Sequence, residues 1–308
     1  MAAPTAEAVS VIIPTYNSAA ILPDAVDSVL CQTQPPAEIV IVDDGSCDET
    51  PIVCAAYAGR ARYLRQENAG ASAARNTGIA ASTGDWLAFL DADDLWEPHK
   101  LERQLEALAQ NPEADFAVGA ANAWSPRRRS YVRAFWDGPL DPAVMRGQLL
   151  VRNILTGLCS SIVIRREAME AVGGFASGKA CEDRRLAIAL LERHRGLLLP
   201  EALVRQRSGP AHWTDPERHR REMLSFIDDH AALYVELDPT GRLRRRAVAR
   251  MHERTGMHYL ENGDGKTAAR ELFRSARLWP FQPNPWRVMI NACLGRLKRP
   301  ESPAAPAM

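Results

Sequence analysis

The chain of 308 residues is predicted to be an α/β protein, in which a mostly parallel sheet is flanked by helices and followed by a C-terminal helical appendage. Over residues 8–120, short β-branched runs alternate with stretches whose apolar residues recur at helical spacing. This is the rhythm of parallel strands joined by helices. Beyond residue 215 the sequence is strongly charged and its periodicity is helical. The length allows one large or two medium domains.

The first four predicted strands are short apolar runs, each followed by a helical pattern or a polar turn. Val9–Ile13 is β-branched and is stopped by Pro14, as expected of a buried parallel strand. The stretch that follows it carries apolar residues on one helical face. The expected strands are 9–13, 38–42, 61–64 and 86–90, and the expected helices between them are 21–30, 48–58 and 71–81.

The later part of the chain gives weaker signals. Residues 121–155, with an arginine run at 127–129, lack a clear period and predict a substrate loop. Residues 252–262 and the amphipathic helix after Asp264 resemble one helical hairpin of the tetratricopeptide type. Because one such hairpin cannot stand alone, we expect an appended cap. The other expected elements are strands at 160–164 and 197–204 and helices at 167–172 and 182–194.

Composition and charge exclude several classes of protein. The 38 basic and 38 acidic residues cancel, so no nucleic-acid partner is expected. The charges are unevenly placed: residues 1–200 hold 19 basic and 25 acidic residues, whereas residues 201–308 hold 19 and 13. No apolar run exceeds six residues and the start lacks a secretory pattern, which favours a cytoplasmic location. The six cysteines lack zinc-like spacing and are expected to be reduced.

Polar side chains follow three of the predicted strands. Thr15-Tyr16-Asn17 follows the first, Asp43-Asp44 the second, and Asp91-Ala92-Asp93-Asp94 the fourth. In open α/β sheets, ligands bind outside the carboxyl ends of the strands, so these residues predict a binding site. Carboxylates this close repel one another unless a cation neutralises them, and a divalent ion that also binds substrate phosphates is the usual solution. A solvated turn with helix-capping aspartates is the alternative.

Six short motifs, taken together, resemble the large family-two glycosyltransferases, which are inverting enzymes of the GT-A fold that use nucleotide-diphosphate sugars. The resemblance covers about residues 8–205, and the motifs occur in one order. Each motif alone is weak, but six in sequence are specific. They are Val9-Ser-Val-Ile-Ile-Pro-Thr-Tyr-Asn17, Val42-Asp-Asp-Gly-Ser46, Asn68-Ala-Gly70, Ala74-Arg-Asn-Thr-Gly78, Gly84-Asp-Trp-Leu-Ala-Phe-Leu-Asp-Ala-Asp-Asp94 and Glu182-Asp183.

The resemblance implies a nucleotide-sugar site and a metal. Asp44 matches the residue that hydrogen-bonds the base, and Arg75 the arginine near the base and diphosphate. Asp93 is expected nearer an Mg²⁺ or Mn²⁺ ion and Asp91 nearer the ribose, while Asp94 can substitute in either role. The full set implied for the nucleotide sugar is Pro14, Thr15, Tyr16, Asn17, Asp43, Asp44, Arg75, Asp91, Ala92 and Asp93.

The resemblance also implies a catalytic base and a diphosphate contact. Asp183 matches the base, with Glu182 beside it, although acidic residues in a helix's first turn are also favoured by the helix dipole. The family's histidine near the diphosphate is missing from its usual place. Arg207 can replace it, since guanidinium binds phosphate well, and His212 is the nearest histidine.

The implied protein is an inverting glycosyltransferase that takes a sugar from a UDP-sugar, the favoured donor, to a glycan or lipid-linked acceptor. Its expected setting is the cytoplasmic membrane face, touched by the basic C-terminal region. The expected divisions are a tail at 1–7, a GT-A domain at 8–214, a helical region at 215–299 and a disordered tail at 300–308.

Two alternatives remain at the level of the sequence. A nucleotidyltransferase shares the fold class and the metal, but should have a glycine-rich basic loop where Pro14-Thr15-Tyr16-Asn17 stands. The other alternative is a non-catalytic nucleotide-sugar-binding protein whose helical appendage recruits partners. A dehydrogenase is disfavoured because no Gly-x-Gly-x-x-Gly follows the first strand.

Overall fold

The structure is a computed structural model, and its contacts divide the chain into two compact units. The first unit comprises residues 1–138, 155–178 and 185–208, and the second comprises 139–154, 179–184 and 209–308. The second unit thus takes in two segments that lie before the predicted division at residue 214. The residues described are 8–125, 130–134, 136–138, 140–155, 157–207, 215–281 and 286.

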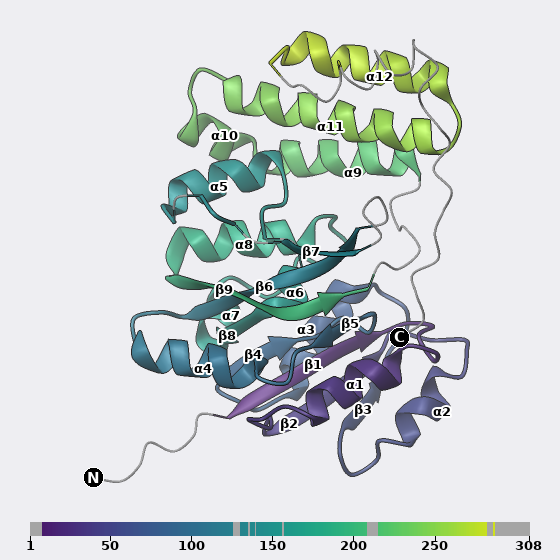
Figure 1. Ribbon diagram of the computed structural model, residues 1–308, viewed down its shortest axis with the longest axis vertical. Coiled ribbons are helices and arrows are strands. Elements are labelled where there is room, and N and C mark those ends of the chain that lie inside the picture. Colours follow the sequence, from purple (N-terminus) through teal and green to yellow (C-terminus); the bar gives the residue numbers. More distant parts are fainter. Residues whose placement is uncertain are drawn as a thin grey trace. The chain divides into compact units, whose positions relative to one another are not determined.

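A mixed sheet forms the centre of the first unit (Figure 1). Its strand order is β3-β2-β1-β4-β8-β6-β9-β5, and β7 pairs with β6. Strands β3, β2, β1 and β4 are mutually parallel, as are β6 and β9, whereas β8 and β5 run antiparallel to their neighbours. The α/β class is confirmed. The strands are β1 (Val9–Thr15), β2 (Glu38–Asp43), β3 (Arg62–Arg65), β4 (Trp86–Phe89), β5 (Asp94–Trp96), β6 (Phe116–Ser125), β7 (Ser130–Ala134), β8 (Ile162–Arg165) and β9 (Gly196–Gln206).

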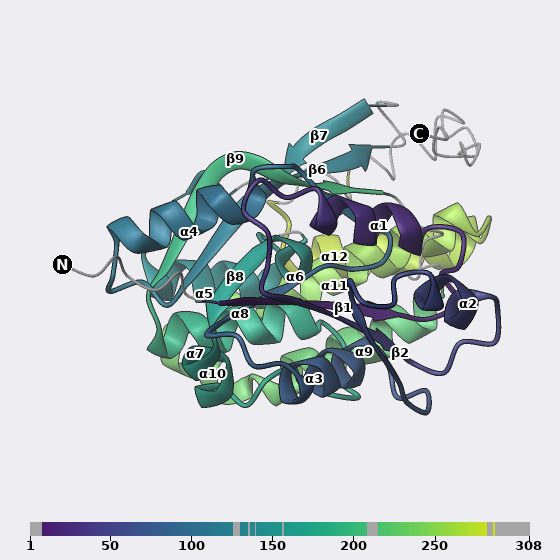
Figure 2. The same ribbon diagram turned by 90° about the horizontal axis from the view of Figure 1, so that it is seen from below.

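Helices cover both faces of the parallel strands (Figure 2). Val11 and Ile13 of β1 belong to a core that includes the buried face of α1, while Val40 and Val42 of β2 pack with Ala74 of α3. Because successive side chains of a strand point to opposite faces, a fully apolar strand needs both covers. The helices that flank the sheet are α1 (Leu22–Leu30), α2 (Thr50–Ala55), α3 (Ala71–Ala81), α4 (Lys100–Gln110), α6 (Leu158–Ser161), α7 (Arg166–Ala171) and α8 (Glu182–Arg193).

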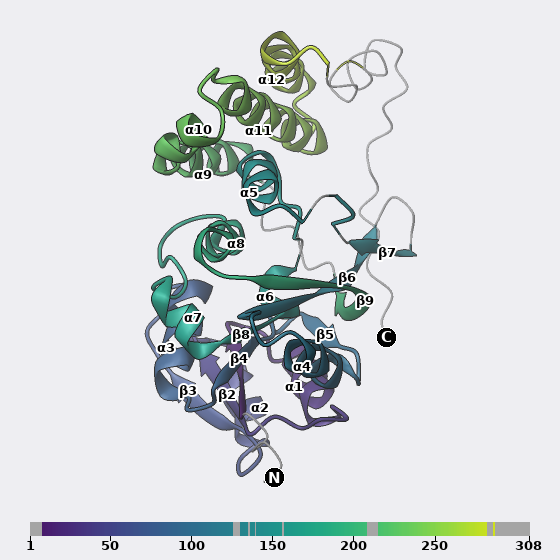
Figure 3. The ribbon, with the colours of Figure 1, turned by 90° about the vertical axis from the view of Figure 1, so that its left-hand side faces the viewer.

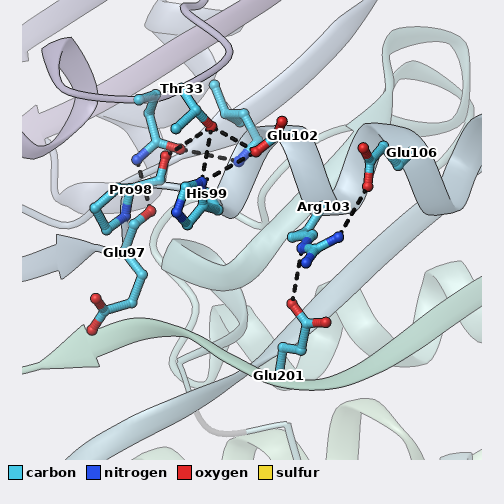
Figure 4. Close-up of polar contacts among 10 residues, drawn as sticks. Thr33, Glu97, Pro98, His99, Glu102, Arg103, Glu106 and Glu201 are labelled. Atoms are coloured by element: carbon cyan, nitrogen blue, oxygen red, sulfur yellow. Dashed lines mark hydrogen bonds and ion pairs between the residues drawn. The ribbon is translucent and has the colours of Figure 1, made fainter.

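The start of α4, a helix absent from the predicted elements, is tied to the loop after α1 (Figure 4). The Thr33 amide donates to the Pro98 carbonyl at 2.9 Å, and the Thr33 hydroxyl donates to Glu102 at 2.9 Å. Further along the helix, Arg103 pairs with Glu201 of β9 at 3.6 Å. These contacts fix the start of α4 beside the loop after α1, and the ion pair joins α4 to β9.

The prediction of a substrate loop at 121–155 is wrong for most of the described residues of this segment. Strand β6 continues to Ser125, β7 follows at 130–134, and α5 (Pro142–Val151) occupies much of the rest. Pairing with β8 and β9 keeps the alanine-rich strand β6 extended despite its weak β-propensity. The Asp141 side chain caps α5 by accepting from the Val144 amide at 2.9 Å. The arginine run at 127–129 lies outside the described residues.

The second unit is helical and includes a hairpin of α11 and α12. The Asp264 carboxylate caps α12, and the Ser275 hydroxyl donates to the Ala249 carbonyl at 2.7 Å, which joins the two helices. Figure 3 shows α5, α9 and α10 beside α11. The predicted hairpin is therefore one part of a larger helical unit. Its later helices are α9 (Pro216–Asp229), α10 (Ala231–Leu237), α11 (Arg242–Glu261) and α12 (Gly265–Leu278).

Five of the six cysteines lie in the described part of the chain. Cys31, Cys47, Cys54, Cys159 and Cys181 are all free thiols. Within the part of the chain that the structure describes, no helix combines the length and the apolar character that a bilayer crossing requires.

Candidate active site

The loops after β1 and β2 are joined by hydrogen bonds that two backbone amides donate. The Asp44 amide donates to the Thr15 carbonyl at 2.8 Å, and the Cys47 amide donates to the Asn17 side chain at 2.8 Å. Asn17 has a φ of 48°, a left-handed conformation that asparagine tolerates better than most residues. Tyr16, which lies between Thr15 and Asn17, is 49% exposed, so its ring faces solvent at the edge of the sheet.

The Thr15 side chain is buried, yet its hydroxyl has no hydrogen-bond partner among the described residues. A buried hydroxyl without a partner is uncommon, because its desolvation is then uncompensated. Pro14 and Ala92, which the resemblance placed in the same set, are buried as well. They shape the ends of β1 and β4 and offer no side-chain polar group.

The two aspartates after β2 have different surroundings. Asp43 is fully buried, and its carboxylate accepts from the Ser46 amide and from the Tyr63 hydroxyl, both at 2.8 Å. Burial, followed by this hydrogen bond to Asp43, raises the pKa of Tyr63 to about 12. Asp43 therefore holds the turn at the end of β2.

Asp44 holds the segment that leads into α3. Its carboxylate accepts from the Gln66 side chain at 2.6 Å, from the Ala69 amide at 2.9 Å and from the Gly70 amide at 2.8 Å. Thr77 of α3 in turn donates to Gln66 at 2.6 Å. A carboxylate has about four acceptor positions, so one remains for a further donor.

Arg75 supplies the cation nearest to the acidic turn. Its guanidinium is 3% exposed and pairs with Asp91 at 2.5 Å. The same group lies 5.0 Å from the ring centroid of Phe175. The Asn76 side chain fixes that ring, since it both donates to and accepts from the Phe175 backbone, at 2.8 and 2.9 Å. Phe175 was not among the predicted site residues.

The three carboxylates of the turn at 91–94 are not equivalent. Asp94 is buried and accepts from the Ser160 hydroxyl at 2.6 Å, while Asp91 and Asp93 are half-buried. Burial, and then the charges of Asp91 and Asp93, raise the pKa of Asp94 well above its usual range. Ser160 also accepts from the Asp91 amide at 3.1 Å, so it supports the whole turn. The sequence carried no signal for this serine.

The turn fits a divalent ion whose ligands come partly from the protein and partly from a substrate. Among the described residues, no group of three or more His, Cys, Asp or Glu side chains forms a metal site. Mg²⁺ and Mn²⁺ in nucleotide sites often take one or two carboxylates, and substrate phosphates and water complete the shell. Asp93, with Asp91 beside it, meets that requirement.

Arg207 links the acidic turn to the start of α1. Its guanidinium donates to the Asp93 carbonyl at 3.0 Å, to Asp24 at 2.7 Å and to the Ile21 carbonyl at 3.1 Å. Each nitrogen thus has a protein partner, and a diphosphate contact by Arg207 stays a prediction. His212 lies outside the described residues.

Glu182 and Asp183 begin α8 and belong to the second unit. The Asp183 carboxylate accepts from the Asn153 amide group at 2.5 Å. The residue before the pair, Cys181, has a φ of 60°, unusual for a residue other than glycine. The next residue, Arg184, is buried and donates to the Leu149 carbonyl at 2.8 Å. The position of Asp183 is therefore fixed within the helical unit, by partners that the sequence did not indicate.

The parallel strands carry an acidic turn and two joined polar loops at their carboxyl ends, which is where α/β proteins of this class bind ligands. The sequence profile of Glycosyl transferase family 2 matches residues 10–173. Because this match covers more than half of the chain, the protein belongs to that family.

Two relatives illustrate the match in sequence. An uncharacterized glycosyltransferase of Haemophilus influenzae is 33% identical over 187 residues, which are 59% of this chain and 62% of that protein. An uncharacterized glycosyltransferase of Nostoc is 49% identical over 104 residues, 32% of each chain. The matched part is thus less than two thirds of either relative.

Two solved structures share the fold. Staphylococcus aureus TarS 1–349 in complex with UDP-GlcNAc has a TM-score of 0.59 at 16% identity, covering 88% of this chain and 91% of that one. The mannosyltransferase PcManGT of Pyrobaculum calidifontis, in complex with GDP-Man and Mn²⁺, has a TM-score of 0.60 at 20% identity and covers 96% and 83%. These similarities confirm the GT-A type of α/β fold.

Proposed function

We propose that this glycosyltransferase moves a sugar from a nucleotide-diphosphate sugar, with a UDP-sugar as the favoured donor, to an acceptor hydroxyl with inversion. The observation that carries the proposal is the acidic turn at 91–94. Arg75 pairs with Asp91 there, Ser160 holds Asp94, and Asp93 is half-buried. Together with membership of the family, this arrangement suits a donor's pyrophosphate bound through a cation.

The donor's nucleoside would bind at the loops after β1 and β2. The buried Thr15 hydroxyl can pair with a polar group of the nucleotide, and the exposed Tyr16 ring can stack on its base. Asp44 has an acceptor position left for a base N–H. Support for the UDP class comes from the structure of TarS with UDP-GlcNAc.

Asp93, assisted by Asp91, would hold Mg²⁺ or Mn²⁺. When bound, such an ion stabilises the charge that develops on the departing diphosphate. The mannosyltransferase solved with GDP-Man and Mn²⁺ supports a divalent ion in this class. Arg75, through its pair with Asp91, would fix the orientation of that carboxylate and lower the repulsion within the turn.

Asp183 would act as the general base. As the acceptor oxygen attacks the anomeric carbon, its proton passes to the Asp183 carboxylate, and the bond from that carbon to the diphosphate oxygen breaks. One displacement inverts the configuration and leaves no covalent intermediate on the protein. The hydrogen bond from Asn153 would orient the carboxylate for this transfer.

The acceptor would be a growing polysaccharide or a lipid-linked glycan at the cytoplasmic face of the membrane. The basic C-terminal part of the chain supports this setting, since residues 201–308 hold 19 basic and 13 acidic residues. A surface of this charge is attracted to anionic lipids, so peripheral contact through this region is expected.

The variant Asp183→Asn tests the catalytic assignment. We expect its kcat to fall by about 10²–10⁴-fold, the usual contribution of a positioned base, with unchanged affinity for a UDP-sugar. Glu192→Gln, near the other end of α8, is the control and should keep full turnover. Release of UDP and titration calorimetry measure the two quantities. Unchanged turnover in Asp183→Asn would contradict the assignment, and a wild-type chain that binds donors without turnover would favour the non-catalytic binder.

A further inference from the structure

A pocket of about 420 Å³ opens within the second unit, among α5, the end of α10 and the first turns of α11. Figures 1 and 3 show these helices side by side. Its wall is largely apolar, with Val144, Leu237 and Leu243 on the helices and Trp279 after α12. The donor site proposed above uses none of these residues.

Gly147 lines the pocket and, having no side chain, leaves space in it. Gly147 faces it from the middle of α5, and a Cβ there would meet only Leu243, at 3.9 Å. That distance is an ordinary van der Waals contact, so a side chain fits at 147 without strain. Glycine in a helix costs about 1 kcal/mol relative to alanine, yet it stands where any larger residue would begin to fill the space.

Two guanidinium groups of α11, Arg242 and Arg246, line the pocket. Neither has a hydrogen-bond or ion-pair partner within the described part of the chain. Other arginines of the same helix do have carboxylate partners: Arg244 pairs with Asp228 at 3.1 Å and Arg250 with Glu253 at 2.5 Å. The pocket thus holds two cations without a carboxylate partner among the described residues.

Asp238, the one carboxylate that lines the pocket, is committed to the backbone. It accepts from the Thr240 amide at 3.0 Å, from the Thr240 hydroxyl at 2.5 Å and from the Leu243 amide at 2.6 Å. These bonds cap α11, so Asp238 cannot also satisfy both arginines. The pocket keeps a net positive charge beside an apolar wall.

We propose that this pocket binds the phosphate headgroup of an anionic membrane phospholipid, with its hydrocarbon chain against the apolar wall. Guanidinium groups bind phosphate through charge-assisted hydrogen bonds, and tryptophan is favoured where apolar and polar surroundings meet. Val144 is 42% exposed and Leu140, just before α5, is 63% exposed, which extends apolar surface beyond the pocket. The inference deepens the proposed membrane setting of this protein, and it depends on the pocket and not on sugar transfer.

Titration calorimetry of the full chain with monomeric dihexanoyl-phosphatidylglycerol tests the pocket directly. We expect saturable binding that is about tenfold weaker in Arg246→Ala, because a hydrogen bond to a charged group is lost. Gly147→Leu should weaken binding more strongly while the chain stays folded, since leucine fills the pocket and favours the helix. Arg245→Ala, which removes the same charge from an exposed position outside the pocket, should bind within about twofold of the wild type.

Three outcomes would overturn the proposal. They are equal binding of dihexanoyl-phosphatidylcholine, binding of inorganic phosphate as tight as that of the lipid, and an unchanged affinity in Gly147→Leu. Sedimentation with phosphatidylglycerol vesicles at low salt tests the membrane setting separately. If the chain binds the monomeric lipid but does not sediment, lipid binding by the pocket is supported and the membrane setting is contradicted. If Gly147→Leu leaves sedimentation unchanged, the role of the pocket is contradicted and the membrane setting is not.

Discussion

Each unit buries an arginine beside a proposed functional carboxylate, and the two arginines are held differently. Arg75 of the first unit pairs with the carboxylate of Asp91. Arg184 of the second unit is 6% exposed, donates to the Leu149 carbonyl and lies 4.1 Å from the centroid of the Phe226 ring. The first arginine neutralises a member of the site, whereas the second anchors the helix start that carries Asp183.

The difference lies in the partner of each guanidinium, a direct ion pair with Asp91 for Arg75 and a backbone carbonyl for Arg184. Around Asp91, the opposite charge of Arg75 lowers the repulsion among three neighbouring carboxylates. Near Asp183, Asn153 donates to the carboxylate, while Arg184 is held by the Leu149 carbonyl and the Phe226 ring and interacts with Asp183 electrostatically. We therefore expect the first unit to set the affinity for donor and metal, and the second to set the rate of proton transfer.

The largest effect is expected from Asp93→Asn in the first unit. Its kinetic defect should differ in kind from that of Asp183→Asn in the second unit. If Asp93 is the metal ligand proposed above, its loss removes several kcal/mol of charge stabilisation, so kcat/KM should fall by about 10³-fold. Unlike Asp183→Asn, it should also abolish the dependence of donor affinity on Mn²⁺, as measured by calorimetry with and without chelator. Asp137→Asn at an exposed position is the control. If donor affinity in Asp93→Asn still depended on Mn²⁺, the assignment of metal binding to the first unit would be contradicted.

The two buried arginines should differ in stability when each is replaced by methionine. Arg75→Met leaves Asp91 without its partner, and we expect the free energy of unfolding to drop by about 3 kcal/mol, at the low end for a broken buried pair because Asp91 is partly exposed. Arg184→Met breaks no direct ion pair, but it leaves the Leu149 carbonyl unsatisfied and removes weaker contacts with Met223 and Asp183, so it should cost about 1–2 kcal/mol. Urea unfolding measures both, and equal losses would show that the carboxylate partner does not matter.

His219 makes the second unit sensitive to acid. This side chain is 7% exposed, and burial, with smaller contributions from His258, Arg254 and Arg184, lowers its pKa to about 4. Because the folded state disfavours the protonated ring, its stabilisation is complete above about pH 6.5 and is lost as the pH falls towards 4, by at most about 3 kcal/mol. His219→Phe should flatten the decline of the urea midpoint between pH 7 and 5, and the exposed His99→Gln should not. Parallel declines in wild type and His219→Phe would contradict this origin.

The smallest effects are expected from two helical glycines of opposite character. A Cβ at Gly78 of α3 would lie 2.4 Å from the Ile12 side chain, so Gly78→Ala should overpack the first unit and cost about 1–3 kcal/mol. Gly147→Ala would meet only Leu243, at an ordinary contact distance of 3.9 Å, and should stabilise the second unit by about 0.5–1 kcal/mol. Opposite shifts of the thermal midpoint are the expected result. A stabilising Gly78→Ala would rule out the close approach of α3 to β1.

The sequence by itself determined the parallel half of the sheet and the acidic groups at its edge. Runs such as Val9–Ile13 are apolar on both faces, and local periodicity is enough to recognise them. Asp43, Asp44 and the turn at 91–94 follow such runs directly, so the chain order fixes them at the strand ends. The capping residue Asp264 was recognisable for the same local reason.

Only the tertiary structure decided the partners that give these acids their separate environments. Ser160 reaches Asp94 across 66 positions, and Asn76 reaches the Phe175 backbone across 99. Strand β5 is three residues long and exists because it pairs with β9, which no periodicity in so short a segment can reveal. Such contacts depend on the closure of long loops and on the packing of the whole core, and neither is encoded in the spacing of neighbouring residues.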